Sequence, residues 1–282
     1  NNMKTYAEYY ELCKQSFDTS NQKLNLYDLK MHICRPNEQS ELFTFPENYS
    51  ELIESLSQKV DAKVGDDSQH YRDPSAKGYE IAIQIKEIWD LPELNEIAGH
   101  ILPCLEETVF GSHIHCSAIH IYRNIPTDSP KISSWLWHYD NNPKEAVKLL
   151  IYLTDVEEDT APLELLEKDG DYVKIQTSRT GHDHWLPPYI PQSRIPENTM
   201  NDLASQGYEK TKIIGPKGTA LFFDNNIVHK ANVPTRAYRD VVIFNIKPTM
   251  LKLDPYISKN FTGSWGHKSP IMNPEELIPR LK

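Results

Sequence analysis

Cysteine is scarce in this chain and follows no recognisable pattern. The four cysteines stand at positions 13, 34, 104 and 116, without any C-x-x-C spacing. A disulfide framework or a cysteine-based zinc site would place them closer together and in a regular pattern. The sequence therefore predicts free thiols in a reducing compartment, and we expect a cytoplasmic protein.

Long apolar runs and an excess of positive charge are missing as well. No stretch approaches the roughly 20 apolar residues that cross a bilayer, and the first residues lack the charged-then-apolar pattern of a secretion signal. The formal net charge is -10, from 40 acidic and 30 basic side chains. This balance argues against a general nucleic-acid or anionic-membrane binder, because both require clustered Lys and Arg. An anionic small molecule could still bind in a locally basic pocket.

The remaining composition is that of an ordinary globular protein, with 39% hydrophobic and 25% charged residues. Its 282 residues suffice for one large domain. We expect a helical N-terminal part over residues 1–110, a β core over 111–250 with an insertion at 178–207, and a tail over 251–282. The sequence does not indicate an oligomeric state.

Three stretches of the first third are predicted helices, and the second and third carry apolar residues at helical spacing. They span residues 6–17, 46–60 and 94–105, and the last two begin close to a proline. Pro103 lies inside the third stretch, where its ring and missing N–H are expected to kink or break a helix.

After Gly111 the chain changes to short stretches rich in β-branched and aromatic residues. Turn sequences such as Lys168-Asp-Gly and Asp224-Asn-Asn separate most of them. Such a series predicts a mainly β fold, a double-sheet jelly roll with N-terminal helices over one face. The expected strands are 113–123, 133–138, 147–154, 163–166, 172–177, 210–214, 218–223, 227–230 and 239–246.

A proline-rich segment at 182–207 interrupts this series and includes a predicted helix over 198–205. An insertion of this length inside a compact β domain is more often functional than neutral. We expect it to form a wall or lid of a substrate pocket. Basic residues in or near it could meet a carboxylate, phosphate or sugar acid, or could be solvated surface charges: Arg179, Arg194, Lys210 and Lys212.

His138 and Asp140 stand two residues apart at the end of a predicted strand, so their side chains point the same way. His229 follows a later strand and adds a second imidazole. Two imidazoles and one carboxylate on one face of a ferrous ion leave the opposite positions open for small molecules. The pattern predicts a non-haem iron site made by His138, Asp140 and His229.

Other interpretations of these histidines stay open. The two imidazoles could be hydrogen-bonded structural groups, with the carboxylate starting an Asx turn. His113-x-His115 could begin a cupin-type metal site, and His182-x-His184 is a further pair. Neither pair has a matching carboxylate and histidine downstream in a β context.

Arg239 opens an apolar strand, Arg-Asp-Val-Val-Ile-Phe-Asn-Ile. A guanidinium there is costly to bury unless it meets an anion, and its planar fork matches the two oxygens of a carboxylate. Arg239 is therefore the candidate for binding a dicarboxylate co-substrate. An ion pair with Asp240 is the alternative, and Arg236 in the preceding loop is the substitute candidate.

Taken together, these motifs resemble the phytanoyl-CoA dioxygenase-like branch of the Fe(II)/2-oxoglutarate-dependent oxygenases. The resemblance covers residues from about 113 to 248 and implies a double-stranded β-helix, a cupin-like jelly roll. Family members usually continue from Pro-Leu-Glu into Pro-Gly-Ser-His, which this chain lacks, so the substrate does not carry over. The segments that carry the resemblance are His138-x-Asp140, 149–156, 161–165, 218–224, His229 and Arg239.

The resemblance implies that His138, Asp140 and His229 bind Fe(II) as the catalytic centre, while Arg239 clamps the distal carboxylate of 2-oxoglutarate. With O2, the co-substrate would be converted to succinate and CO2 as a C–H bond of a small or carrier-linked metabolite is hydroxylated. The metabolite could derive from a sugar, a lipid or an amino acid. Asp140 favours hydroxylation over halogenation, because related halogenases lack this carboxylate. A non-catalytic jelly-roll carbohydrate-binding protein is the alternative from another class, since 15 Tyr and 5 Trp would suit stacking on sugars.

Overall fold

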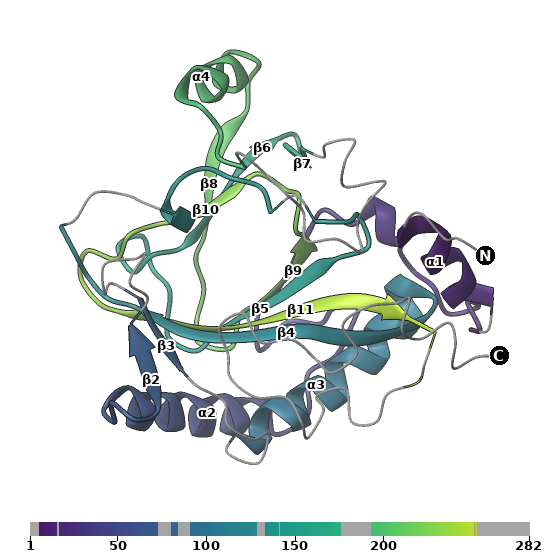
Figure 1. The fold of residues 1–282 in the computed structure, drawn as a ribbon, viewed down its shortest axis with the longest axis horizontal. Coiled ribbons are helices and arrows are strands. Elements are labelled where there is room, and N and C mark those ends of the chain that lie inside the picture. The colour runs from purple at the N-terminus through teal and green to yellow at the C-terminus, as the bar shows by residue number, and fades with distance from the viewer. Residues whose placement is uncertain are drawn as a thin grey trace.

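The computed structural model describes residues 6–15, 17–72, 80–83, 91–128, 133–140, 142–175, 193–250 and 252. Within these residues the chain forms two β-sheets that face each other, with helices on the outer side of the larger sheet (Figure 1). This arrangement confirms the predicted mainly β, double-sheet architecture.

The larger sheet has seven strands in the order β1-β9-β5-β11-β4-β3-β2, and every neighbouring pair is antiparallel. The smaller sheet has the order β10-β6-β7, with β8 also paired to β6. The strands of the larger sheet are β1 (Met31–Cys34), β2 (His70–Arg72), β3 (Glu80–Ile83), β4 (His113–Asn124), β5 (Val147–Tyr152), β9 (Ala220–Asp224) and β11 (Arg239–Thr249). Those of the smaller sheet are β6 (Leu163–Lys168), β7 (Asp171–Tyr172), β8 (Glu209–Ile213) and β10 (His229–Ala231).

Side chains of β11 alternate between two apolar environments. Val242 and Phe244 belong to the core that includes the helices, whereas Val241 and Ile243 pack with residues of the smaller sheet. A strand buried on both faces needs apolar residues at consecutive positions, which explains its nearly continuous hydrophobic sequence. The space between the sheets is the interior of the jelly roll.

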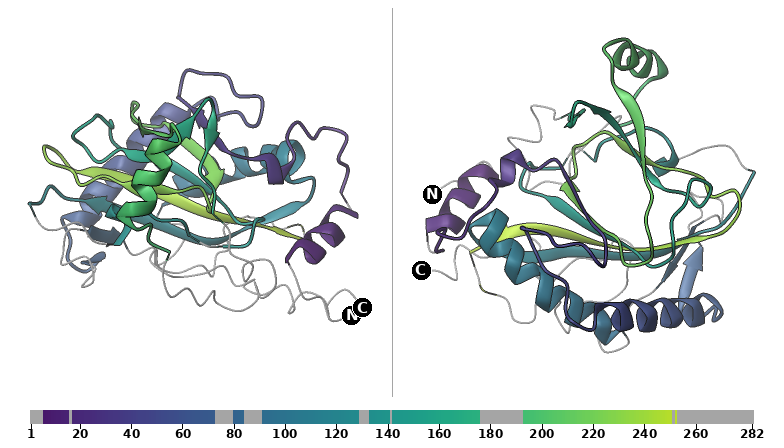
Figure 2. Two further views of the ribbon diagram at one scale, coloured as in Figure 1. Left: turned by 90° about the horizontal axis from the view of Figure 1, so that it is seen from above. Right: turned by 180° about the vertical axis from the view of Figure 1, so that it is seen from behind.

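Two long helices cover the outer face of the larger sheet, α2 (Tyr49–Val64) and α3 (Pro92–Leu105). Figure 2 shows them along that face from behind. The buried side chains of α2 recur at helical spacing, at Leu52, Ile53, Leu56 and Val60 among others. The remaining α-helices in the described residues are α1 (Tyr6–Gln15) beside the end of β11, and α4 (Glu197–Ser205), which projects beyond β8 (Figure 1). All four predicted helices are confirmed, with ends shifted by a few residues.

Pro103 does not break α3, because it lies only two residues before the end of that helix. The chain continues as a π-helical turn, Glu106–Phe110, and stops at Gly111. Gly111 has a φ of 55°, and a Cβ there would lie 2.9 Å from Cγ2 of Thr19. Glycine is therefore required at the point where the chain changes from helix to strand.

Three expectations about strands need correction. The first third is not purely helical, because β1, β2 and β3 join the two edges of the larger sheet. Their pairing depends on distant residues, such as Met31 opposite Phe223, so short local patterns did not indicate them. The predicted strand at 133–138 is instead a 3-10 helix, η4 (Ser133–Trp135), followed by a single bridged residue, His138. Of the expected strand at 172–177, the described part contributes Tyr172 to β7 and Lys174 to an isolated bridge, and residues 176 and 177 lie outside the described residues.

Parts of the predicted insertion and tail, residues 176–192 and 253–282, lie outside the described residues. All four cysteines are free, and three of them are buried, as expected. Among the helices of the described ranges, none has the length and apolarity to cross a membrane.

Candidate metal centre

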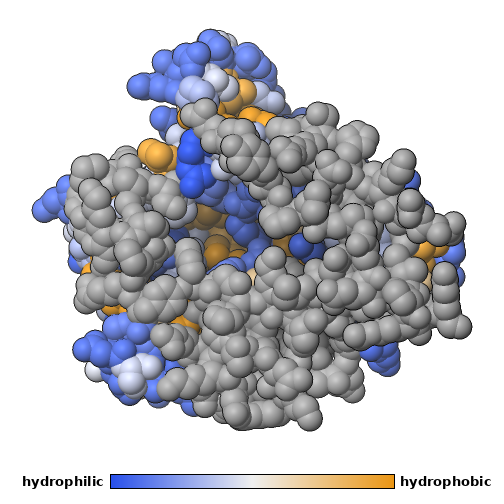
Figure 3. Space-filling view, viewed as in Figure 1, coloured by the Kyte–Doolittle hydropathy of each residue, from blue (hydrophilic) through white to orange (hydrophobic). Residues whose placement is uncertain are grey.

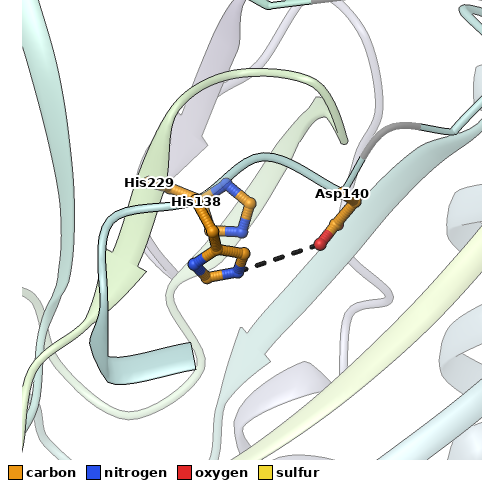
Figure 4. Close-up of side chains that lie close together, drawn as sticks. All are labelled: His138, Asp140 and His229. Carbon is orange, nitrogen blue, oxygen red and sulfur yellow. Dashed lines mark ion pairs between the residues drawn. The ribbon is translucent and has the colours of Figure 1, made fainter. Parts of the chain in front are cut away.

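The three predicted metal ligands lie together between the two sheets. One donor atom of each of His138, Asp140 and His229 lies within 4.8 Å of the other two. Figure 4 shows both imidazole rings and the carboxylate pointing toward one another. No other group of three His, Cys, Asp or Glu donors gathers in this way in the described part of the chain.

Backbone pairing makes the two histidines neighbours. The amide of His138 donates to the carbonyl of His229 at 3.0 Å, and the amide of His229 donates back at 2.8 Å. On the other side of His229, β10 pairs with β6, so that Leu165 lies directly opposite. Opposed residues of antiparallel strands project from the same face of a sheet. Since Leu165 belongs to the interior core, both imidazoles face the interior.

A backbone carbonyl fixes the orientation of each ring. Nδ1 of His138 donates to the carbonyl of Leu136 at 2.8 Å, and Nδ1 of His229 donates to that of Ile227 at 2.6 Å. A carbonyl only accepts hydrogen bonds, so the proton of each neutral ring lies on Nδ1. Nε2 of each ring therefore presents a lone pair, as a metal ligand must.

Asp140 is held by the turn between β9 and β10. Its amide donates to the carbonyl of Asn225 at 3.1 Å. Next to it, Asn142 and Asn226 form two reciprocal hydrogen bonds of 3.0 and 2.8 Å between backbone and side chain. Asp224 caps this turn by accepting from the amide of Asn226 at 2.7 Å. The sequence Asp224-Asn-Asn therefore braces the carboxylate ligand and also leads the chain into His229.

The charge states of these ligands suit metal binding. Burial lowers the pKa of His229 to about 3 and also lowers the pKa of His138, so both rings are neutral near pH 7. Burial opposes the charge on Asp140, but Lys148, with smaller contributions from His229 and His138, more than offsets it and holds the pKa of that carboxyl below its usual range. Two neutral imidazoles and one carboxylate are therefore available together.

Lys148 is a site residue that sequence analysis missed. It lies on β5, forms an ion pair with Oδ2 of Asp140, and is partly buried. Oδ1 of the same carboxylate lies 3.8 Å from Nε2 of His138. The sequence signal was a single charged residue within the apolar strand Val-Lys-Leu-Leu-Ile-Tyr, on the same face as Leu150.

Arg239, the predicted co-substrate residue, lies in the interior at the start of β11 and is only 1% exposed. Its position in the strand puts it on the face of Val241 and Ile243. The guanidinium donates to Oδ1 of Asn124 at 2.7 Å and to the carbonyl of Ala161. Its Nε has no hydrogen-bond partner among the residues that the structure describes.

Two alternatives were open for this site: an ion pair of Arg239 with Asp240, and Arg236 as the residue that binds the co-substrate. Asp240 does not pair with Arg239, because it points the other way and binds Arg123 at 2.7 Å. Arg236 is exposed and is already paired with two surface carboxylates. Arg239 is thus the better placed of the two arginines to meet an anion in the interior.

The rival pair of histidines is not assembled into a metal site. Nδ1 of His113 lies 3.3 Å from the carboxylate of Glu106. His115 is buried, and no third donor joins these histidines within the described ranges. The pair His182-x-His184 lies outside the described residues.

Comparison with known proteins bears on the fold. No protein-family model and no curated protein matches the sequence. Among solved structures, EctD from S. alaskensis with bound Fe superposes with a TM-score of 0.51 at 15% identity, covering 78% of this chain and 73% of EctD. EctD with 2-oxoglutarate and 5-hydroxyectoine gives a TM-score of 0.50 at 16% identity, covering 81% and 76%. The chain has the EctD fold.

The similarity to EctD confirms the double-stranded β-helix that the motifs implied. The face in Figure 3 is hollowed between the two sheets, and both hydrophilic and hydrophobic residues are visible inside the hollow. The described part of this chain therefore combines the fold of an iron-containing structure with its own His-Asp-His cluster.

Proposed function

We propose that this chain is a non-haem Fe(II)- and 2-oxoglutarate-dependent dioxygenase. It hydroxylates a C–H bond of a small or carrier-linked metabolite and releases succinate and CO2. The observation that carries the proposal is the convergence of His138, Asp140 and His229 in the interior of a jelly roll. The free thiols support a reducing compartment such as the cytoplasm.

The donor set fits a ferrous ion. Two neutral imidazoles and one carboxylate are typical of non-haem Fe(II) oxygenases, in which the remaining coordination positions stay open. The carbonyls that accept from both Nδ1 atoms keep the rings aligned. Lys148 engages one oxygen of Asp140 and leaves the other directed toward His138. When bound, the iron supplies the oxidative chemistry with O2 and 2-oxoglutarate.

Arg239 is proposed to bind the distal carboxylate of 2-oxoglutarate. It is a buried cation with an unsatisfied Nε and no carboxylate partner among the described residues. Asn124 and the carbonyl of Ala161 hold the guanidinium in place without neutralising it. A fixed guanidinium facing the interior is suited to pair with both oxygens of one carboxylate.

Anaerobic spectroscopy tests this proposal directly. Adding Fe(II) and 2-oxoglutarate to the protein should produce a weak visible charge-transfer band. Asp140→Ala should abolish the band, whereas Asp171→Ala, which removes an exposed acid paired with Lys30, should keep it. Absence of the band from the intact, folded protein would contradict the proposal and favour a non-catalytic jelly roll.

A further inference from the structure

Arg194 lies in the same row of side chains as the two histidine ligands. It forms an antiparallel β-bridge with His138. On one side of this pair the amide of Ile195 donates to the carbonyl of Trp137 at 2.8 Å, and on the other side the amide of Tyr139 donates to the carbonyl of Ser193 at 3.2 Å. This is the non-hydrogen-bonded type of antiparallel pair, in which the opposed side chains come closest and share a face.

The row across the smaller sheet therefore runs Arg194, His138, His229 and Leu165. Because the last three face the interior, the side chain of Arg194 starts from the interior face as well. It is partly buried, and the charge of Asp140 acts on it. Arg194 thus brings a permanent positive charge to the metal centre, on the side of His138 that lies away from His229.

This cation has no acidic partner among the described residues. Its one side-chain hydrogen bond goes from Nη1 to the hydroxyl of Ser193 at 3.0 Å. Arg194 shares this with Arg239 but differs from two nearby lysines: Lys148 pairs with Asp140, and Lys212 pairs with Glu158 at 2.6 Å.

The balance of charge at the metal centre consequently favours an anion. Two cations, Lys148 and Arg194, stand against the single carboxylate of Asp140, before any metal ion is counted. A partly buried guanidinium without a counter-charge is costly, and an oxyanion can satisfy it with two parallel hydrogen bonds.

We propose that Arg194 binds an oxyanion group, a carboxylate or a phosphate, of the substrate. This inference rests on the proposed function and narrows it to anionic metabolites. Next to His138, the guanidinium would hold the anionic end of the substrate beside the metal, and the rest of the molecule would extend from that fixed point. The carboxylate of 2-oxoglutarate nearest the metal is the other source of the same chemistry, and the experiment separates the two.

The experiment uses the protein with Zn(II) and saturating 2-oxoglutarate, so that no turnover occurs. Methylphosphonate, acetate and the neutral acetamide are titrated while the arginine Nε–H signals are followed by NMR. We expect the signal that Arg194→Gln removes to shift with the two anions and not with acetamide. The same variant should weaken anion binding by roughly ten- to hundredfold, the value of a charge-assisted hydrogen bond.

Two variants serve as controls for this titration. Arg194→Lys keeps the charge and should retain part of the anion response. Arg236→Gln removes an exposed arginine already paired with Asp159 and Glu157, and should leave the response unchanged. The dispersion of the amide signals shows whether each variant is folded.

Three results would overturn the assignment. The first is an anion response that is unchanged in a folded Arg194→Gln protein, and the second is an intact ternary complex that no anion perturbs. The third is a loss of 2-oxoglutarate affinity in Arg194→Gln, measured with Fe(II) by the charge-transfer band, which would assign the arginine to the co-substrate. Failure of the proposed function looks different, because the intact protein would then give no band at all.

Discussion

His115 offers a quantitative test of how burial controls stability in this fold. It lies on β4, is 2% exposed, and its Nδ1 has no hydrogen-bond partner within the described residues. Burial, followed by the charge of Lys247 on the paired strand, lowers its pKa to about 3. In the unfolded chain the same imidazole titrates with a pKa of about 6.5.

The sign of the effect follows from proton binding. Between pH 6.5 and about pH 3 the unfolded chain binds a proton at this position and the folded chain does not, so stability falls as the pH is lowered through this range. A pH of 5 lies about 1.5 pH units below the pKa of the imidazole in the unfolded chain. The free energy of unfolding is therefore about 2 kcal/mol lower at pH 5 than at pH 7.5. For a chain of this size that loss lowers Tm by roughly 4–8 °C.

The contribution of His115 to the pH dependence of stability can be measured by urea unfolding. The wild type and His115→Leu are compared at pH 7.5 and pH 5.0 with a chelator present. Leucine fills a similar volume and does not titrate. The loss of unfolding free energy on acidification should be about 2 kcal/mol smaller in the variant, because all other titrations cancel between the two proteins. Equal losses in both proteins would refute the reasoning. Unchanged metal affinity in the variant would also rule out His115 as a metal ligand.

Arg239→Met should weaken 2-oxoglutarate binding by roughly ten- to hundredfold in charge-transfer titrations, with a smaller loss of affinity in Arg239→Lys. Equal affinity in the wild type and both variants would contradict the proposed role of Arg239. Asp240→Asn should lower the free energy of unfolding in urea by about 3 kcal/mol, because the buried guanidinium of Arg123 then keeps only one carboxylate partner, the more exposed Asp61. A decrease below about 1 kcal/mol would show that the pair of Arg123 and Asp240 is not stabilising. Gly218→Ala should cost about 1–3 kcal/mol, because Gly218 has a φ of 91° and a Cβ would lie 3.0 Å from Pro36. An unchanged unfolding midpoint would count against that strain.

Local sequence patterns alone determined much of the metal centre. The residue types and order of His138, Asp140 and His229 indicated the donor set, although His138 is an isolated bridge and Asp140 lies outside the strands. The alternation along β11 follows from strand geometry. The same alternation puts Arg239 on the interior face of β11, together with Val241 and Ile243. Helical spacing likewise identified α2 and α3, because each helix buries one face.

Other features depended on pairing between distant parts of the chain. β1 was missed because four residues hold little periodic signal, and the strand exists through its pairing with β9. The strand expected at 133–138 was wrong for the converse reason, since Ser133–Trp135 form a 3-10 helix and only His138 forms β-bridges there.

The sequence by itself determined which donors this protein has and the chemistry they suit. Only the tertiary structure decided that Lys148 pairs with Asp140 and that Arg194 lies beside His138. The physical reason is range: a side chain's direction is set by the backbone dihedrals of its own strand, whereas its neighbours across a sheet are set by register with strands many residues away.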